Sequence, residues 1–307
     1  MNYAVKEFKV LSCDGIHQLS AVAYVPEGEA RGIFHIAHGM TEYIARYGAF
    51  MALLAENGYI AVGYDHLGHG HTVNDESELG FIASKRGWEL LVRDIKTFHD
   101  AVKKEYGDLP YYLMGHSMGS FIVRLAAARY VRPDKLIIMG TGGPNPAADA
   151  GLALIAILKR LYGERSYSRF LRKLAFGSYN KTFGGYDAND PGRWLTNRED
   201  IRNKYYADKL CTYQFTVSAM GDLIRLTKYC NSAGWYKELD KSLPILIVSG
   251  EDDPVGDYGK GVMTVQNKLK KTGHDSRCIL YKGARHEILN DLSEDDVKRD
   301  ILEFIAR

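Results

Sequence analysis

Residues 111–121, YYLMGHSMGSF, place a serine between two glycines at the end of an apolar run. Gly115, Ser117 and Gly119 fit the pattern G-x-S-x-G, which follows a predicted strand and precedes a predicted helix. A turn this tight forces the serine towards positive φ, and side chains two positions away would collide, so glycine stands at both places. The stretch predicts a nucleophilic Ser117 raised above a sheet, the alternative being a serine with only a structural role in the turn.

Strands and helices alternate outward from this turn in both directions. Predicted strands, most of them nearly continuous apolar runs typical of parallel strands buried on both faces, occupy residues 32–39, 59–65, 111–116, 135–140, 244–250 and 277–281. One face of a predicted helix is formed by Leu91, Ile95, Phe98 and Val102. The alternation predicts a parallel sheet with right-handed crossovers, and residues 5–11 and 17–25 add a half-exposed hairpin.

The alternation of strands and helices stops near Gly140 and resumes at residue 244. The residues between are helical or irregular in character and rich in tyrosine and basic side chains. We therefore expect a core made of residues 1–141 and 236–307, interrupted by a helical lid at residues 142–235. The lid would cover the carboxyl ends of the strands, where open α/β sheets bind their ligands.

A nucleophilic serine needs a base to take its proton, and the base needs a carboxylate to orient it. In a fold with this turn, the acid and then the histidine follow the serine along the chain. Asp253 fits the acid best because it follows Gly250 at the spacing G-x-x-D, and Asp252 is its rival. His286 is the one histidine beyond the last predicted strand. The alternatives are acidic residues that only solvate a loop and a histidine on the surface.

Two backbone N–H groups usually hold the oxyanion of an acyl-transfer reaction. One belongs to the residue after the nucleophile, here Met118, and the other to the loop after the third strand, here Met40. Gly39 would let this loop come close to the substrate, and His116, beside the nucleophile, is expected to contact the substrate as well. An apolar loop residue without a catalytic role is the alternative for Met40.

Charge and cysteine spacing exclude several classes of protein. The net charge of +2, without a basic motif interleaved with aromatic residues, gives no reason to expect a nucleic-acid partner. The four cysteines are widely spaced, so neither a zinc site nor a disulfide framework is predicted. His66, His69 and His71 share a glycine-rich loop with Asp65, but their spacing is poor for convergence on a metal ion. We expect these histidines to buttress the loop and predict no metal site.

The N-terminus lacks the apolar segment of a signal peptide, and the longest apolar run, residues 151–158, is too short to span a bilayer. These features predict a cytoplasmic protein, and nothing in the sequence indicates its oligomeric state. Basic residues follow the apolar run over residues 158–173. In a lid, this segment would either make peripheral contact with an anionic membrane or form a helix with a solvated face.

Six segments, taken in order, resemble the serine hydrolases of the α/β-hydrolase superfamily, in the branch of monoglyceride lipases and lysophospholipases also labelled serine aminopeptidase-like. These segments are AHGMTEYIARYGAF, GYDHLGHGHT, GFIASKRGWELLVRDI, GHSMGS, GEDDPVG and GARHEILND. The likeness covers the core at both ends of the chain and is weaker in the lid. It implies an α/β-hydrolase fold with an eight-stranded, mostly parallel sheet flanked by helices and an inserted helical lid.

The resemblance also implies roles for single residues. They are Ser117 as nucleophile, Asp253 as acid, His286 as base, Met40 and Met118 as oxyanion donors, and Cys211 as a lid cysteine near the substrate. The family's D-H-x-G-H-G-x-S segment reads DHLGHGHT here, and the threonine in its last place affects no catalytic role. The implied substrate is an amphiphilic carboxylic ester with one acyl chain.

Three functions are compatible with these residues. The first is an ester hydrolase without a cofactor, acting on a monoacylglycerol, a lysophospholipid or a smaller ester. The second is an aminopeptidase of the same fold, which would need carboxylates in the lid to hold the substrate's ammonium group. Carboxylates available for this are Asp187, Asp190, Glu199 and Asp200. The third is a ligand-binding homologue that turns over slowly.

Overall fold

A computed structural model describes residues 2–185 and 187–307 of the chain. Within these residues, the main chain forms an eight-stranded sheet in the order β1-β2-β4-β3-β5-β6-β7-β8. Its strands are β1 (Tyr3–Leu11), β2 (Gln18–Pro26), β3 (Gly32–Ala37), β4 (Tyr59–Tyr64), β5 (Tyr111–His116), β6 (Lys135–Met139), β7 (Ile245–Gly250) and β8 (Ser276–Tyr281). The β1–β2 hairpin is antiparallel, β2 pairs antiparallel with β4, and the strands from β4 to β8 run parallel. The predicted mostly parallel sheet is confirmed.

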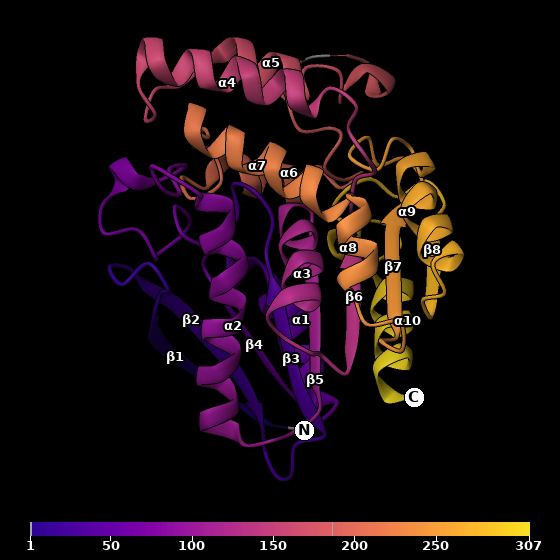
Figure 1. Cartoon of the computed structure of the whole chain (residues 1–307). Coiled ribbons are helices and arrows are strands. Elements are labelled where there is room, and N and C mark those ends of the chain that lie inside the picture. The colour runs from indigo at the N-terminus through magenta and orange to yellow at the C-terminus, as the bar shows by residue number, and fades with distance from the viewer. Residues whose placement is uncertain (1, 186) are drawn as a thin grey trace.

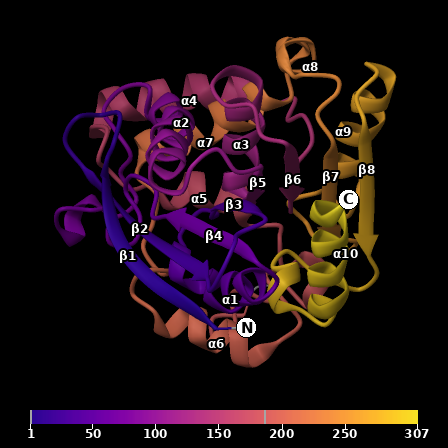
Figure 2. The ribbon, with the colours of Figure 1, turned by 90° about the horizontal axis from the view of Figure 1, so that it is seen from below.

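Helices cover both faces of the sheet (Figure 2). One face carries α1 (Gly48–Glu56) and α10 (Glu294–Ala306), and the other carries α2 (Gly87–Tyr106), α3 (Met118–Arg129) and α9 (Lys260–Lys271). Each face has its own apolar core, since buried side chains of the helices pack against alternate residues of the strands. Strands β3, β4, β5 and β7 are buried along their whole length because helices cover both of their faces.

The predicted amphipathic helix is confirmed as α2. Its predicted apolar face is buried, with Leu91, Ile95, Phe98 and Val102 at most 1% exposed. Short 3-10 helices lie in the loops of the fold, namely η1 (Ile44–Tyr47), η2 (Glu76–Glu78), η3 (Lys181–Phe183) and η4 (Ile288–Asn290). No described helix has the length and apolar character that a membrane span requires.

Residues 140–244, which we call the insertion, separate β6 from β7 although the two strands are neighbours in the sheet. The insertion contains α4 (Ala148–Tyr162), α5 (Arg169–Phe176), α6 (Glu199–Ala207), α7 (Val217–Cys230) and α8 (Ala233–Glu238). Figure 1 shows α4 and α5 at the top of the molecule, above α7 and farthest from both chain ends. The predicted boundaries at residues 142 and 235, and the action of this segment as a lid, remain predictions.

The last part of the insertion is tied to the core through α3. Arg124 donates a hydrogen bond of 2.6 Å to the carbonyl oxygen of Cys230, at the end of α7. The indole N–H of Trp235, in α8, donates in turn to the carbonyl oxygen of Arg124 at 2.6 Å. Both side chains are fully buried, so α7 and α8 are packed on the core while α4 and α5 lie outside them.

Candidate active site

Ser117 occupies a strained turn between β5 and α3. Its φ of 53° and ψ of −119° lie in a region that side chains rarely adopt. A Cβ on Gly115 would lie 2.3 Å from the carbonyl oxygen of Gly119, and a Cβ on Gly119 would lie 2.1 Å from the carbonyl oxygen of Ala37. Both glycines are therefore required by close backbone approach. The N–H of Ser117 donates to the carbonyl oxygen of Met139 at 3.0 Å. This hydrogen bond fixes the turn on the neighbouring strand.

Asp253 and His286 form a buried pair beside this turn. His286 Nδ1 and Asp253 Oδ2 are 2.8 Å apart, and the two residues are 3% and 0% exposed. The other oxygen of Asp253 accepts a hydrogen bond from the N–H of Val255 at 2.8 Å, which holds the carboxylate in place. Asp253, rather than its rival Asp252, thus contacts the histidine. This contact leaves the other ring nitrogen, Nε2, free to face the site.

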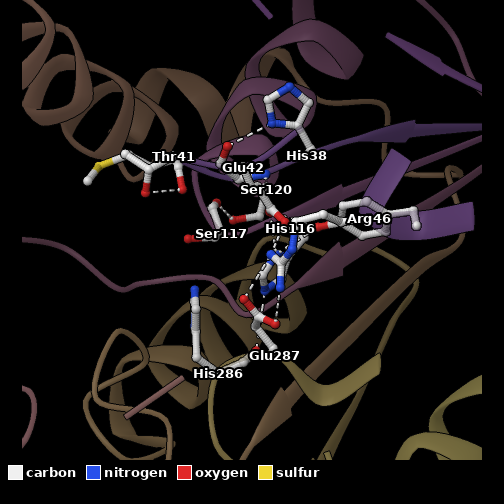
Figure 3. A network of polar contacts seen from close by, with 12 residues as sticks. His38, Thr41, Glu42, Arg46, His116, Ser117, Ser120, His286 and Glu287 are labelled. Atoms are coloured by element: carbon white, nitrogen blue, oxygen red, sulfur yellow. Dashed lines mark hydrogen bonds and ion pairs between the residues drawn. The ribbon is translucent and has the colours of Figure 1, made fainter. Parts of the chain in front are cut away.

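The parallel sheet brings the three groups to one edge, because β5, β7 and β8 all end there. In Figure 3, the ring of His286 lies with a nitrogen towards Ser117. Within the described residues, no hydrogen bond joins Ser117 Oγ to His286. Such bonds are commonly long in ligand-free enzymes and tighten when substrate binds. The arrangement suits a base acting on the serine hydroxyl.

The loop after β3 approaches the serine closely. A Cβ on Gly39 would lie 3.1 Å from Ser117 Cβ and 2.6 Å from Glu42 Oε1, so only glycine fits here. The N–H of Gly39 donates to Glu42 Oε1 at 2.5 Å. In the part of the chain that the structure describes, the next N–H, that of Met40, makes no hydrogen bond. The N–H of Met118 is one of the free groups at the start of α3.

A buried network of charged groups lies beneath this loop, and it was not predicted from the sequence. Arg46 donates to Glu42 Oε2 at 2.8 Å and to both carboxylate oxygens of Glu287, at 3.0 and 2.7 Å (Figure 3). His116 Nδ1 lies 3.1 Å from Glu42 Oε1 and 2.9 Å from the hydroxyl of Tyr47. Its Nε2 lies 3.3 Å from the carbonyl oxygen of His286. The network joins the loop after β3, the residue before Ser117 and the histidine loop.

These contacts shift the pKa values of the network. Burial alone would raise the pKa of Glu42, but the hydrogen bond from His116 and the charge of Arg46 hold it well below its ordinary value. Burial alone would lower the pKa of His116, but its hydrogen bond to Glu42 and the charges of Glu42 and Glu287 raise it overall. The network therefore favours charged side chains although it is buried.

The insertion covers the histidine loop. The rings of Trp194 and His286 are 5.1 Å apart at their centroids, and the ring of Tyr179 is 5.0 Å from that of Trp194. The N–H of Glu287 donates to the carbonyl oxygen of Leu195 at 2.7 Å. These aromatic residues of the insertion thus form a wall beside the predicted base. Their position could not be predicted because tyrosine and tryptophan in an irregular segment carry no spacing signal.

Two predicted substrate contacts, His116 and Cys211, are buried in the structure, at 4% and 2% exposure. Burial raises the pKa of the Cys211 thiol to about 12, so the thiol stays protonated at neutral pH. Cys211 follows α6, in a turn that is tied to the loop after β3 because the hydroxyl of Tyr43 donates to Asp208 at 2.7 Å. Contact of His116 or Cys211 with substrate remains a prediction.

The ring of His38, in the loop after β3, lies close to the rings of His66 and His69, whereas His71 does not belong to this group. The ring centroids of His38 and His66 are 4.2 Å apart, and those of His38 and His69 are 5.3 Å apart. His38 Nε2 accepts a hydrogen bond from the N–H of His66 at 2.9 Å, so the ring links the two loops. Burial lowers the pKa of all three rings, which keeps them neutral. Among the described residues, no group of three or more histidine, cysteine or acidic side chains could hold a metal ion.

Known proteins resemble this chain in sequence and in fold. Residues 28–293 match the model of the family Hydrolase_4, described as serine aminopeptidase, S33. A thermostable carboxyl esterase from Bacillus coagulans, solved with glycerol, is 31% identical, with a TM-score of 0.91 over 99% of this chain and 98% of that one. Monoglyceride lipase of Mus musculus is 25% identical over 88% of this chain and 80% of its own length. Monoacylglycerol lipase of Mycolicibacterium smegmatis is 24% identical, with coverages of 92% and 91%.

Proposed function

Because the chain belongs to the Hydrolase_4 family, serine aminopeptidase S33, and is a serine hydrolase of the α/β-hydrolase type, we propose that Ser117, His286 and Asp253 are its catalytic triad. The observation that carries this proposal is the buried 2.8 Å contact between His286 and Asp253, next to a serine held at a φ of 53°. The reaction is the hydrolysis of a carboxylic ester with one acyl chain.

In this mechanism, His286 Nε2 takes the proton of Ser117 Oγ as the oxygen attacks the ester carbonyl. Asp253 keeps the imidazole in the tautomer with its proton on Nδ1 and stabilises the imidazolium that forms. The same nitrogen of His286 then gives the proton to the departing alcohol. Water attacks the acyl-enzyme by the reverse sequence, with His286 again as base.

The oxyanion of the tetrahedral intermediate would accept hydrogen bonds from the N–H groups of Met40 and Met118. Their availability supports this role, since Glu42 already occupies the N–H of Gly39. Glu42 thereby holds the loop in place and leaves the N–H of Met40 available to the substrate. Such donors contribute roughly 10²- to 10³-fold each to the rate of acyl transfer.

Two observations support a lipid-derived ester as the substrate. Relatives of this chain are named monoglyceride lipase and monoacylglycerol lipase, and a similar structure is that of a carboxyl esterase. The aromatic wall of Trp194 and Tyr179 stands beside His286, where an acyl chain would lie under the insertion acting as a lid. Monoacylglycerols, lysophospholipids and smaller esters all fit this description.

The alternative function is the release of N-terminal residues from peptides. The acidic side chains of the insertion support it less well than the observations above support ester hydrolysis. Asp187 pairs with Arg193 at 2.6 Å, and Asp190 pairs with Arg202 at 2.8 Å. A carboxylate that an arginine already neutralises is a weak ligand for a substrate's ammonium group. Comparing an aminoacyl nitroanilide with a fatty acyl ester decides between the two functions, and we expect turnover of the ester alone.

The outer helices of the insertion support peripheral contact with an anionic membrane. Large apolar side chains that are at least half exposed here are Ile157, Leu161, Tyr162, Tyr167, Phe170 and Leu174. Exposed basic residues lie among them, namely Arg160, Arg165, Arg169, Arg172 and Lys173. An apolar surface flanked by positive charge suits the interface of anionic lipids.

Co-sedimentation with vesicles tests this contact. We expect the wild-type protein to sediment with vesicles that contain phosphatidylglycerol more than with pure phosphatidylcholine. Replacing Phe170 and Leu174 by serine should remove most of this binding and leave hydrolysis of a water-soluble ester intact. Equal sedimentation of the double variant and the wild type would show that α5 does not contact the membrane.

Labelling with a fluorophosphonate tests the proposed nucleophile. The wild-type protein should be labelled and should hydrolyse p-nitrophenyl butyrate, whereas Ser117→Ala should do neither while keeping its circular dichroism spectrum. Ser77→Ala, at an exposed position in η2, is the matched control and should behave as the wild type. Labelling that persists in Ser117→Ala rules out Ser117 as the nucleophile.

A further inference from the structure

His116 lies in the buried network but is not accounted for by the proposed mechanism. It is the last residue of β5, directly before Ser117, and it is 4% exposed. Its ring is 4.8 Å from that of His286, at an angle of 41°. A Cβ on Gly140 would lie 3.2 Å from His116 Cδ2 and 3.3 Å from His286 Cε1, so the strand end packs on both rings. The ring of His116 thus underlies the loop that carries the proposed base.

The hydrogen-bond partners of His116 define its protons. Nε2 faces the carbonyl oxygen of His286, which can only accept, so Nε2 carries a proton. The hydroxyl of Tyr47 lies 2.9 Å from both Glu42 Oε1 and His116 Nδ1, and donating its one proton to the carboxylate leaves none for Nδ1. Nδ1 lies 3.1 Å from the same carboxylate oxygen, where an unprotonated nitrogen would place lone pair against lone pair. A proton on each ring nitrogen satisfies all of these contacts at once.

The charges that surround His116 agree with this result. Glu42 and Glu287 are two carboxylates, and Arg46 is the single guanidinium that bridges them. An imidazolium at His116 gives the network two positive and two negative charges, which removes the cost of an unpaired buried carboxylate. The remaining titratable groups that face the ring are the hydroxyl of Tyr47 and the imidazole of His286.

We propose that His116 is a positioning residue, held as an imidazolium by Glu42 and Tyr47, which donates a hydrogen bond from Nε2 to the carbonyl oxygen of His286 and so fixes the base opposite Ser117. This proposal rests on the proposed catalytic function of Ser117 and His286. The carboxylate of Glu42 then positions the loops on both sides of the site. It holds the oxyanion loop through the N–H of Gly39, and it holds the base loop through His116.

Two substitutions separate the hydrogen bond from the charge. His116→Gln keeps an N–H close to the position of Nε2, and His116→Asn keeps one only near Nδ1; both remove the positive charge. In His116→Asn, kcat for p-nitrophenyl butyrate should fall by roughly 10- to 100-fold, the loss expected from a small misplacement of a catalytic group, with KM nearly unchanged. His116→Gln should keep most of the wild-type kcat. His99→Asn, on α2 and remote from the site, is the matched control and should change neither constant.

The pH profile provides the second readout. A neighbouring positive charge lowers the pKa of an imidazole, so losing the charge of His116 should move the acid limb of kcat/KM upward by about one pH unit. We expect this shift in both the Gln and the Asn variants, although only the Asn variant loses kcat. In ¹⁵N-histidine NMR spectra of the wild type at pH 7.5, the two ring nitrogens that disappear in His116→Gln should both be protonated.

Different outcomes contradict different parts of the account. A wild-type protein that fluorophosphonate does not label refutes the proposed function itself. A labelled wild type whose kcat is unchanged in a folded His116→Asn variant refutes the positioning role. If that variant does not fold, an unshifted acid limb in His116→Gln or a singly protonated ring in the NMR spectrum refutes the imidazolium, and with it the proposal.

Discussion

At the scale of single residues, the site depends on glycines that permit close backbone contacts. Gly119, the second residue of α3, meets the end of β3, where the carbonyl oxygen of Ala37 would lie 2.1 Å from an added Cβ and that of His38 2.6 Å. No flexible side chain is available to move away. A methyl group at this position must therefore push α3, and Ser117 with it, away from the oxyanion loop.

Gly119→Ala should accordingly lose both stability and activity. We expect the free energy of unfolding to fall by about 3 kcal/mol, at the upper end of overpacking costs, together with hydrolysis of p-nitrophenyl butyrate. Urea denaturation and steady-state kinetics measure the two effects. The control is Gly234→Ala in α8, where an added Cβ makes only ordinary contacts at 3.5 Å and 3.6 Å. A Gly119→Ala variant as stable and active as this control would contradict the packing described here.

Glu42 should make the stability of the protein depend on pH. Its pKa is below the ordinary value in the folded chain, so its charge stabilises the fold above about pH 4.3, the value in unfolded chains. This stabilisation is lost as the pH falls below that value. Glu42→Gln should therefore lower the free energy of unfolding by about 3 kcal/mol at pH 7, the cost of breaking a buried ion pair, and by less at pH 3.5.

Urea denaturation at the two pH values measures this difference. Glu7→Gln, at an exposed position on β1, is the control and should show no such dependence. A gap between wild type and Glu42→Gln that stays constant or widens on acidification would contradict the role of the Glu42 charge.

At the scale of elements, the insertion has three parts with different contacts. Its final helices are tied to α3 by buried hydrogen bonds, and its middle part contacts the histidine loop through Trp194 and Leu195. The outer helices, α4 and α5, carry the exposed apolar side chains. The wall beside His286 therefore belongs to the middle part of the insertion, and the proposed membrane surface belongs to the outer part.

Trp194→Ala tests whether the wall contacts the acyl chain. Without the indole, kcat/KM should fall by about tenfold more for p-nitrophenyl decanoate than for p-nitrophenyl acetate, since only the longer chain loses apolar contact of about 1.4 kcal/mol. Tyr162→Ala, exposed at the end of α4, is the matched control and should leave the ratio of the two esters unchanged. An equal loss for both esters in Trp194→Ala would mean that the indole acts on His286 and not on the substrate.

Features of the structure could be predicted from the sequence where they depend on neighbouring residues, and could not where they depend on contacts between distant residues. The elbow around Ser117 could be predicted because glycine at both ends of a tight turn is a local requirement, and α2 could be predicted from its helical spacing. The network of Glu42, Arg46, His116 and Glu287 could not, because it joins residues about 240 positions apart and depends on burial of charges that a sequence shows as polar loop residues. The buried position of His116 is likewise set by residues distant in sequence, namely Tyr47, Gly140 and His286.

At the scale of the whole molecule, the sheet decides where chemistry can occur. The predicted parallel strands are confirmed, and their common direction brings the loops after β3, β5, β7 and β8 to one edge. Each loop contributes one part of the proposed site, namely Met40, Ser117, Asp253 and His286. The insertion between β6 and β7 starts from the same edge, and its aromatic wall lies beside the site, where the N–H of Glu287 donates to the carbonyl oxygen of Leu195.

The most direct test of the account is a crystal structure of the protein after reaction with an alkyl fluorophosphonate. We predict phosphorus bonded to Ser117 Oγ, a phosphonyl oxygen accepting hydrogen bonds from the N–H groups of Met40 and Met118, and His286 Nε2 within hydrogen-bond distance of the adduct. The alkyl chain should lie against Trp194. An adduct on another residue, or a phosphonyl oxygen directed away from both N–H groups, would contradict the central claim.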